Sequence, residues 1–179
     1  MEHIHILALS GSLRKASYNT AALEALSRLA PDYINIDVYK GIRNFPLFNP
    51  DREEEMIPIV NQLQSALAKS DGLIIASPEY AHGMSGVIKN MLDWLVSGEA
   101  FINMPVALLN TSPRATHAQA ALREVIKTMS GNIVEKASIS IPLLGTQFGV
   151  NDIFNDEKIS ALLISSVQDF YTEVVKLKH

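Results

Sequence analysis

The chain has 179 residues, of which 47% are hydrophobic and 19% are charged, values that are typical of a folded domain rather than a disordered segment. Its formal net charge of -4 and pI of about 5.7 exclude the basic surface that nucleic-acid binding requires. The absence of cysteine excludes disulfides, thiolate metal sites and cysteine nucleophiles, so any redox chemistry depends on a bound cofactor.

Strand-length apolar runs alternate with helix-period segments along the first 70 residues. Residues 4–9 form the first predicted strand, and their continuous apolar run indicates burial on both faces. A helix is predicted over 19–29, where leucine and alanine recur at helical spacing. Residues 34–39 alternate and predict a second strand. Residues 41–51 contain two prolines and are predicted to be irregular, and a helix is predicted over 53–70.

The same alternation continues to the end of the chain. Three further strands and three further helices are predicted, each strand preceding its helix. In chain order these six elements cover residues 72–77, 86–96, 105–110, 116–129, 133–141 and 157–176.

Five strand–helix repeats predict an α/β fold with a doubly wound, five-stranded parallel sheet and helices on both faces. The flavodoxin-like strand order 2-1-3-4-5 is the predicted topology. In that order ligands bind beyond the carboxyl ends of the strands, at the loops that follow strands one, three and four. Residues 1–179 are expected to form a single domain. We find no membrane-length apolar run and no signal-peptide pattern, so we expect a cytoplasmic protein with no membrane partner.

The loop after the first strand, residues 10–19, is rich in groups that bind phosphate. It carries serine hydroxyls, an asparagine amide and Arg14 directly before a helix N-terminus, where unpaired N–H groups attract anions. No dinucleotide-binding glycine motif and no P-loop motif is present. The alternative interpretation is structural, with Ser17 or Asn19 simply capping the helix.

Residues 11–19 read Gly-Ser-Leu-Arg-Lys-Ala-Ser-Tyr-Asn and resemble the G-S-x-R-x-x-S-x-N signature of the NADPH-dependent FMN reductase family. This family includes flavin-dependent quinone, azo-compound and chromate reductases. The resemblance implies that the FMN phosphate is surrounded by Ser10, Ser12, Arg14, Ser17, Tyr18 and Asn19.

The loop after the third strand carries a second resemblance to the same family. Residues 78–94 follow its P-E-Y-N-x-S-x-P-G-x-L-K-N-x-x-D-W pattern, with departures that include Ala81, Gly83 and Ser85. Glycines here allow the backbone to approach a flat ligand, and Tyr80 is a candidate wall for its ring. The predicted cofactor-binding residues of this loop are Pro78, Glu79, Tyr80, His82 and Gly83. His82 is open to a second interpretation, as a solvated surface residue.

Two further segments resemble parts of this family. In the loop after the fourth strand, Ser112 is predicted to contact the cofactor, whereas Arg114 replaces the usual glycine. Arg114 either stabilises negative charge on the reduced flavin or points to solvent. Residues 44–51 resemble a segment that contributes to subunit contacts in relatives. Their exposed apolar residues predict a surface that a partner covers, and the alternative is that the segment docks on its own domain. The resemblance implies self-association as a dimer or tetramer.

The predicted function is FMN-dependent NAD(P)H oxidoreduction, in which NADPH or NADH reduces bound FMN and a quinone, azo compound, free flavin or similar small molecule accepts the electrons. No catalytic acid or base and no metal is predicted, because the cofactor supplies the chemistry. The alternatives are a flavodoxin-type electron carrier and a flavin-binding sensor without NAD(P)H turnover of its own. The T-x-T-G-x-T phosphate loop that flavodoxins generally use is absent.

Overall fold

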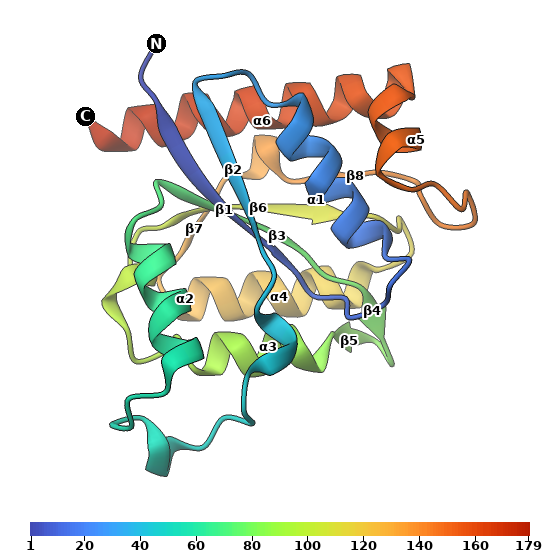
Figure 1. Cartoon of the computed structure of the whole chain (residues 1–179). Helices are drawn as coiled ribbons and strands as arrows, with labels where there is room; N and C mark the ends of the chain where they lie inside the picture. Colours follow the sequence, from blue (N-terminus) through green and yellow to red (C-terminus); the bar gives the residue numbers. More distant parts are fainter.

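A parallel sheet forms the centre of the fold in the computed structural model, which describes residues 1–179 (Figure 1). Its strands lie in the order β2-β1-β3-β6-β7, and β8 pairs in parallel with the carboxyl end of β6. The predicted order 2-1-3-4-5 is confirmed, since β6 is the fourth segment and β7 with β8 the fifth. The strands are β1 (Ile4–Ser10), β2 (Ile34–Tyr39), β3 (Gly72–Ala76), β6 (Pro105–Asn110), β7 (Asn132–Ile133) and β8 (Ile139–Ser140).

The fifth strand is interrupted, so the prediction of one continuous strand over 133–141 was wrong. The 3-10 turn η4 (Glu135–Ala137) separates β7 from β8 and buries Ala137 in the core. At the break, the hydroxyl of Ser138 accepts the backbone N–H of Leu108 at 3.1 Å and donates to the carbonyl of Val134 at 3.0 Å. The Ser138 hydroxyl takes the place of the strand carbonyl that the turn removes. The Leu108 N–H therefore keeps a hydrogen-bond acceptor.

Alternate side chains of the central strand enter two separate cores, one on each face of the sheet. Ile4, Ile6 and Ala8 of β1 pack on one side, and Leu7 and Leu9 on the other. As Figure 1 shows, helices cover both faces, which explains why this strand is apolar throughout. The first face carries α1 (Tyr18–Leu29), α5 (Val150–Asn155) and α6 (Glu157–Lys178), and the second carries α2 (Pro58–Ala68), α3 (Gly86–Asp93) and α4 (Thr116–Thr128).

One helix prediction needs correction, and one helix was missed. The helix predicted over 53–70 begins only at Pro58, because proline is tolerated in the first turn but would lose a hydrogen bond inside a helix. The helix α5 was not predicted. It is six residues long, and the Asp152 carboxylate accepts the N–H of its N-cap residue Gly149 at 2.8 Å. No helix combines the length and apolar character that a membrane span needs.

The irregular segment after β2 is held against α3 by two side chains. It contains the short 3-10 turns η1 (Ile42–Asn44) and η2 (Pro50–Arg52). Asn90 accepts the N–H of Phe48 at 2.8 Å and donates to the carbonyl of Pro46 at 2.9 Å, and Trp94 Nε1 donates to the same carbonyl at 2.9 Å. These two positions of the family pattern therefore orient a neighbouring segment rather than line a ligand cavity.

Candidate functional site

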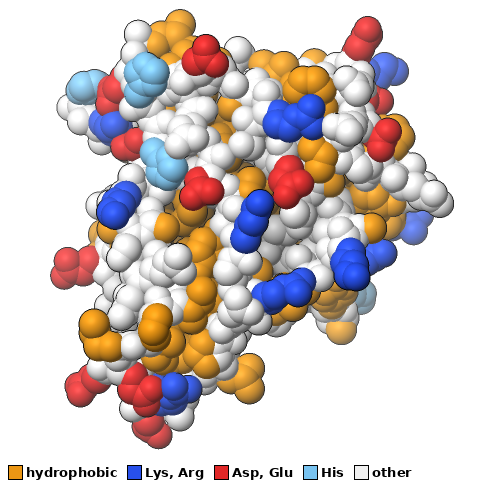
Figure 2. Space-filling view, viewed as in Figure 1, with side chains coloured by type: hydrophobic (Ala, Val, Ile, Leu, Met, Phe, Trp, Pro, Cys, Tyr) orange, Lys and Arg blue, Asp and Glu red, His pale blue; other side chains and the backbone are white.

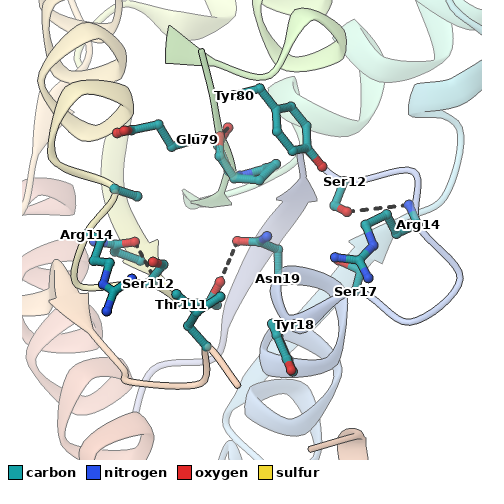
Figure 3. Close-up of a pocket in the computed structure, with 15 residues that line it drawn as sticks. Ser12, Arg14, Ser17, Tyr18, Asn19, Glu79, Tyr80, Thr111, Ser112 and Arg114 are labelled. Atoms are coloured by element: carbon teal, nitrogen blue, oxygen red, sulfur yellow. Dashed lines mark hydrogen bonds between the residues drawn. The ribbon is translucent and has the colours of Figure 1, made fainter. Parts of the chain in front are cut away.

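Three loops meet at the carboxyl edge of the sheet, following β1, β3 and β6, and enclose a cavity of about 310 Å³ (Figure 3). These are the three loops at which the strand order predicted a ligand. The cavity is lined by residues from all three loops and by Leu144, which follows β8. The full lining is Ser12, Arg14, Ser17, Tyr18, Asn19, Ser77, Pro78, Glu79, Tyr80, Asn110, Thr111, Ser112, Arg114, Ala115 and Leu144.

Nine of the twelve predicted cofactor-binding residues line this cavity, and Ser10, His82 and Gly83 do not. The Ser10 hydroxyl shares a hydrogen bond of 2.7 Å with that of Thr20 and faces a neighbouring hollow. The exposed His82 ring stacks on His117, with ring centroids 4.3 Å apart. Gly83 pairs with Tyr80 in a small hairpin. The cofactor role of the twelve residues stays a prediction.

The loop after β1 presents hydroxyls and a helix N-terminus to the cavity. Ser17 is the N-cap of α1, and its side chain accepts the N–H of Thr20 at 3.2 Å. The interpretation of Ser17 as a helix cap is thus confirmed, and the residue lines the cavity as well. The Ser12 hydroxyl accepts the N–H of Arg14 at 3.4 Å. A helix N-terminus with hydroxyls and a guanidinium beside it fits a phosphate group.

A buried hydrogen bond joins the first and third loops. The hydroxyl of Thr111 donates to Oδ1 of Asn19 at 3.1 Å, and the dashed line in Figure 3 marks this bond. Asn110 braces the third loop, because its Oδ1 accepts the N–H of Ser112 at 3.0 Å. Sequence reasoning missed Asn110 and Thr111 as lining residues. Their position at the carboxyl end of the fourth strand could have identified them as lining residues. No sequence pattern marks Leu144 as a lining residue.

The loop after β3 folds into the hairpin β4 (Glu79–Tyr80) and β5 (Gly83–Met84). Its two central residues, Ala81 and His82, have φ angles of 48° and 59°, as a type I′ turn requires. Asparagine tolerates this conformation better than alanine does. The family's asparagine at position 81 therefore suits the turn, and the alanine here is strained.

Replacing Ala81 with asparagine is expected to raise the free energy of unfolding by about 1 kcal/mol, because it relieves this strain. For a chain of this length the thermal midpoint should rise by about 2–4 °C. Thermal unfolding followed by circular dichroism measures the change. The control is Ala120→Asn, at an exposed position inside α4, which should lower the midpoint. An unchanged or lower midpoint for Ala81→Asn would contradict the account of strain.

Glu79 connects the hairpin to α4. Its Oε2 accepts the N–H of Ala118 at 2.8 Å, in the first turn of a helix whose N-cap residue, Ala115, makes no side-chain cap. A carboxylate is favourable at a helix N-terminus, because it satisfies an unpaired donor and meets the positive end of the helix dipole. Glu79 thus caps the helix from a distance and orients the loop after β3.

The lining is cationic at both ends. Arg14 and Arg114 belong to the loops on opposite sides of the cavity in Figure 3, and neither takes part in an ion pair. Glu79 is the single acidic residue of the lining, and its carboxylate accepts an α4 N–H. Tyr80 and Pro78 add flat, weakly polar surface between the two cationic ends. These residues fit a flat ligand that ends in a phosphate, such as FMN.

A doubly wound parallel sheet, with a phosphate-binding loop after its first strand and a cavity at its switch point, defines the flavodoxin-like class. Within this class the chain belongs to the NADPH-dependent FMN reductase family, whose model matches residues 4–143. The predicted family is confirmed. With it the class of activity, the FMN cofactor and the nicotinamide electron donor are confirmed too.

Individual relatives agree with this assignment. The chain is 30% identical to an NAD(P)H-dependent FMN reductase of Pseudomonas aeruginosa, covering 99% of this chain and 98% of the relative. It is 29% identical to a quinone reductase of Escherichia coli strain K12, covering 75% and 76%. Among solved structures it resembles FerB, a flavoenzyme NAD(P)H:(acceptor) oxidoreductase of Paracoccus denitrificans. The TM-score is 0.81, with 25% identity over 97% of this chain and 98% of that one.

Proposed function

We propose that the chain uses NAD(P)H to reduce a small-molecule acceptor, such as a quinone, an azo compound or free flavin, through FMN bound between the three loops. The observation that carries this proposal is the lining of the cavity. It combines a cationic, hydroxyl-rich end at the N-terminus of α1 with a flat wall at the loop after β3. The quinone reductase named above supports a quinone as one acceptor.

The phosphate of FMN would be held by Ser12, Arg14, Ser17 and the first turn of α1. Hydroxyl and backbone donors bind phosphate oxygens, and a guanidinium can bind two of them together. The ring would lie toward Tyr80 and Ser112, which line the other part of the cavity. When bound, FMN supplies the chemistry that accepts a hydride and passes electrons on.

The chain's own residues would bind and orient the substrates. Tyr80 is 53% exposed, so the wall that it forms is open to solvent, and NAD(P)H and an acceptor can reach it in turn. Arg114 is exposed but belongs to the lining of the cavity, and this position supports the first of the two interpretations of this residue. A positive charge here stabilises negative charge that develops beside it.

The remaining parts of the proposal concern the setting in which the chain works. We propose a single FMN-binding domain over residues 1–179 that acts in the cytoplasm and self-associates. Leu47 and Met56 lie in the segment between η1 and α2 and are both 84% exposed. They support self-association through this segment, because a second copy that covers them would remove their apolar surface from water.

Titration with FMN and steady-state assays test the proposed function. The protein should bind FMN with quenching of flavin fluorescence, and it should oxidise NADPH or NADH when a quinone is present and no other reductase is added. An electron carrier would bind FMN but oxidise almost no nicotinamide, and a sensor would turn over very slowly with every acceptor. Protein that stays colourless after incubation with FMN would contradict the proposal.

A further inference from the structure

A second cavity of about 310 Å³ lies on the other side of the loop after β1, between α1 and the end of β2. We call it the Lys40 cavity. Its charged lining residues are Arg14, Lys40 and Arg43, opposed by a single carboxylate, that of Glu24. Figure 2 shows blue side chains gathered across the end of β2 and the loop before α1. The cavity thus presents a local excess of positive charge on a chain whose net charge is negative.

The fold brings these cations together from distant parts of the sequence. Lys40 directly follows β2, and Ile42 in η1 is buried at 7% exposure, which anchors the turn and leaves its neighbours Lys40 and Arg43 at the surface. Gly41 permits this path, because a β-carbon there would lie 2.5 Å from the Tyr39 hydroxyl. The phosphate-binding loop after β1 supplies Arg14.

No protein carboxylate forms an ion pair with this cluster. The ion pairs of the chain involve other residues, so Arg14, Lys40 and Arg43 each lack a carboxylate partner. Three cations and the single carboxylate of Glu24 leave a net positive charge in the cavity, and Lys40 and Arg43 keep theirs when Arg14 holds the FMN phosphate. A bound anion relieves the repulsion between such cations. Arginine also offers paired donors that match phosphate oxygens.

Neutral donors line the same cavity. The hydroxyls of Ser12 and Thr20 belong to its lining, and so does Tyr39. The Tyr39 hydroxyl is buried and has no hydrogen-bond partner within the chain. Burial raises the pKa of this phenol, so it remains a protonated donor at neutral pH. A phosphate oxygen is an acceptor that would satisfy it once the side chain turns toward the bound ligand.

We propose that the Lys40 cavity binds a phosphate group of the incoming nicotinamide dinucleotide. This inference rests on the proposed function, since it assigns a site to the electron donor. The Lys40 cavity shares Ser12 and Arg14 with the candidate FMN cavity, so the two lie on opposite sides of one loop. A dinucleotide carries its phosphates well away from its nicotinamide ring, so a phosphate can reach the Lys40 cavity while the ring lies against the exposed side of FMN held in the other cavity. The phosphate is either the pyrophosphate, common to NADH and NADPH, or the 2′-phosphate, present in NADPH alone.

The test is the double variant Lys40→Ala/Arg43→Ala, prepared with FMN bound. Both side chains are exposed and unpaired, so the variant should fold normally. The matched control is Lys69→Ala/Lys127→Ala, which removes two exposed cations that line neither cavity. We expect the double variant to raise the KM for NADPH about tenfold, which corresponds to roughly 1.4 kcal/mol of lost binding. The Kd for FMN should be unchanged, and the control should match the wild type.

Comparing nicotinamides identifies the phosphate. A rise in KM for NADPH alone assigns the 2′-phosphate, and an equal rise for NADH assigns the pyrophosphate. Calorimetry with adenosine 2′,5′-bisphosphate and with ADP gives a readout without turnover, and the double variant should bind the corresponding probe about tenfold more weakly. Glu24→Gln should have the opposite effect, since it removes the opposing charge.

Two results would overturn the inference. One is a wild-type KM for both nicotinamides together with wild-type binding of both probes. The other is an FMN Kd that rises as much as the KM, which would show that these cations hold the FMN phosphate instead. Failure of the proposed function is distinguishable, because it would appear as wild-type protein that oxidises neither nicotinamide, and the calorimetry would still report on the cavity.

Discussion

Replacing Gly11 with alanine is expected to destabilise the fold and to abolish tight FMN binding. A β-carbon at this position would lie 2.5 Å from Ile88 Cγ1, 2.8 Å from Ser85 Oγ and 3.0 Å from Ser77 Oγ. Ile88 is fully buried, so it has little freedom to move away. Overpacking of this kind costs about 1–3 kcal/mol. The loop can relieve the clash only by shifting, which would displace the residues that we propose bind the FMN phosphate.

Thermal unfolding and FMN fluorescence titration together measure the effect of Gly11→Ala. The free energy loss should lower the thermal midpoint by several degrees, at about 2–4 °C for each kcal/mol. The control is Gly86→Ala at the start of α3, where a β-carbon would meet no atom within 4 Å. That variant should keep both the midpoint and the FMN affinity. Wild-type values for Gly11→Ala would show that the loop does not depend on this close approach.

Replacing Ser17 with aspartate is expected to separate the two roles of this residue. Aspartate is as good an N-cap as serine, and its charge is favourable at a helix N-terminus, so the apoprotein should keep its stability. A carboxylate facing the cavity would, however, repel the FMN phosphate. We expect the Kd for FMN to rise at least about a hundredfold, since two charges about 4 Å apart near a protein surface interact by roughly 4 kcal/mol.

Ser17→Asn is the matched control, because asparagine also caps helices and carries no charge. It should preserve the thermal midpoint of the apoprotein and lose much less FMN affinity than Ser17→Asp. Fluorescence titration in low salt gives the clearest comparison, since salt screens the repulsion. Equal FMN affinity for Ser17→Asp and wild type would place the phosphate elsewhere in the cavity.

The sequence predicts the fold and the main loops well because their signals are periodic or local. The parallel sheet followed from the strand–helix alternation, and its order from the doubly wound topology expected for five strands. Nine of the predicted cofactor-binding residues line one cavity because they lie in loops that follow strand ends. The β4–β5 hairpin escaped prediction, since strands of two residues carry no alternating pattern. The break in the fifth strand depends on the hydroxyl of Ser138, a tertiary interaction that leaves no periodic trace.

Groups that converge from distant positions were the hardest to predict. Lys40 and Arg43 lie more than 20 residues from Arg14 in the sequence, and only the parallel pairing of β1 with β2 brings them to one cavity. Leu144 likewise comes from a distant segment, since it follows β8, whose pairing with β6 brings it to the candidate FMN cavity. His82 was predicted near the cofactor from its loop position, yet the turn directs its ring onto His117.

The hydrogen bond between Asn19 and Thr111 has a consequence for how ligands bind. Both residues are buried. The bond joins the first turn of α1, where we propose that the FMN phosphate binds, to the loop after β6 on the other side of the cavity. The spacing between the two ends is therefore set when the chain folds. The site is preorganised, so the conformational entropy of aligning its loops is lost during folding rather than on ligand binding. Two ligands that differ only in length would then differ in affinity because the cavity does not adjust to them.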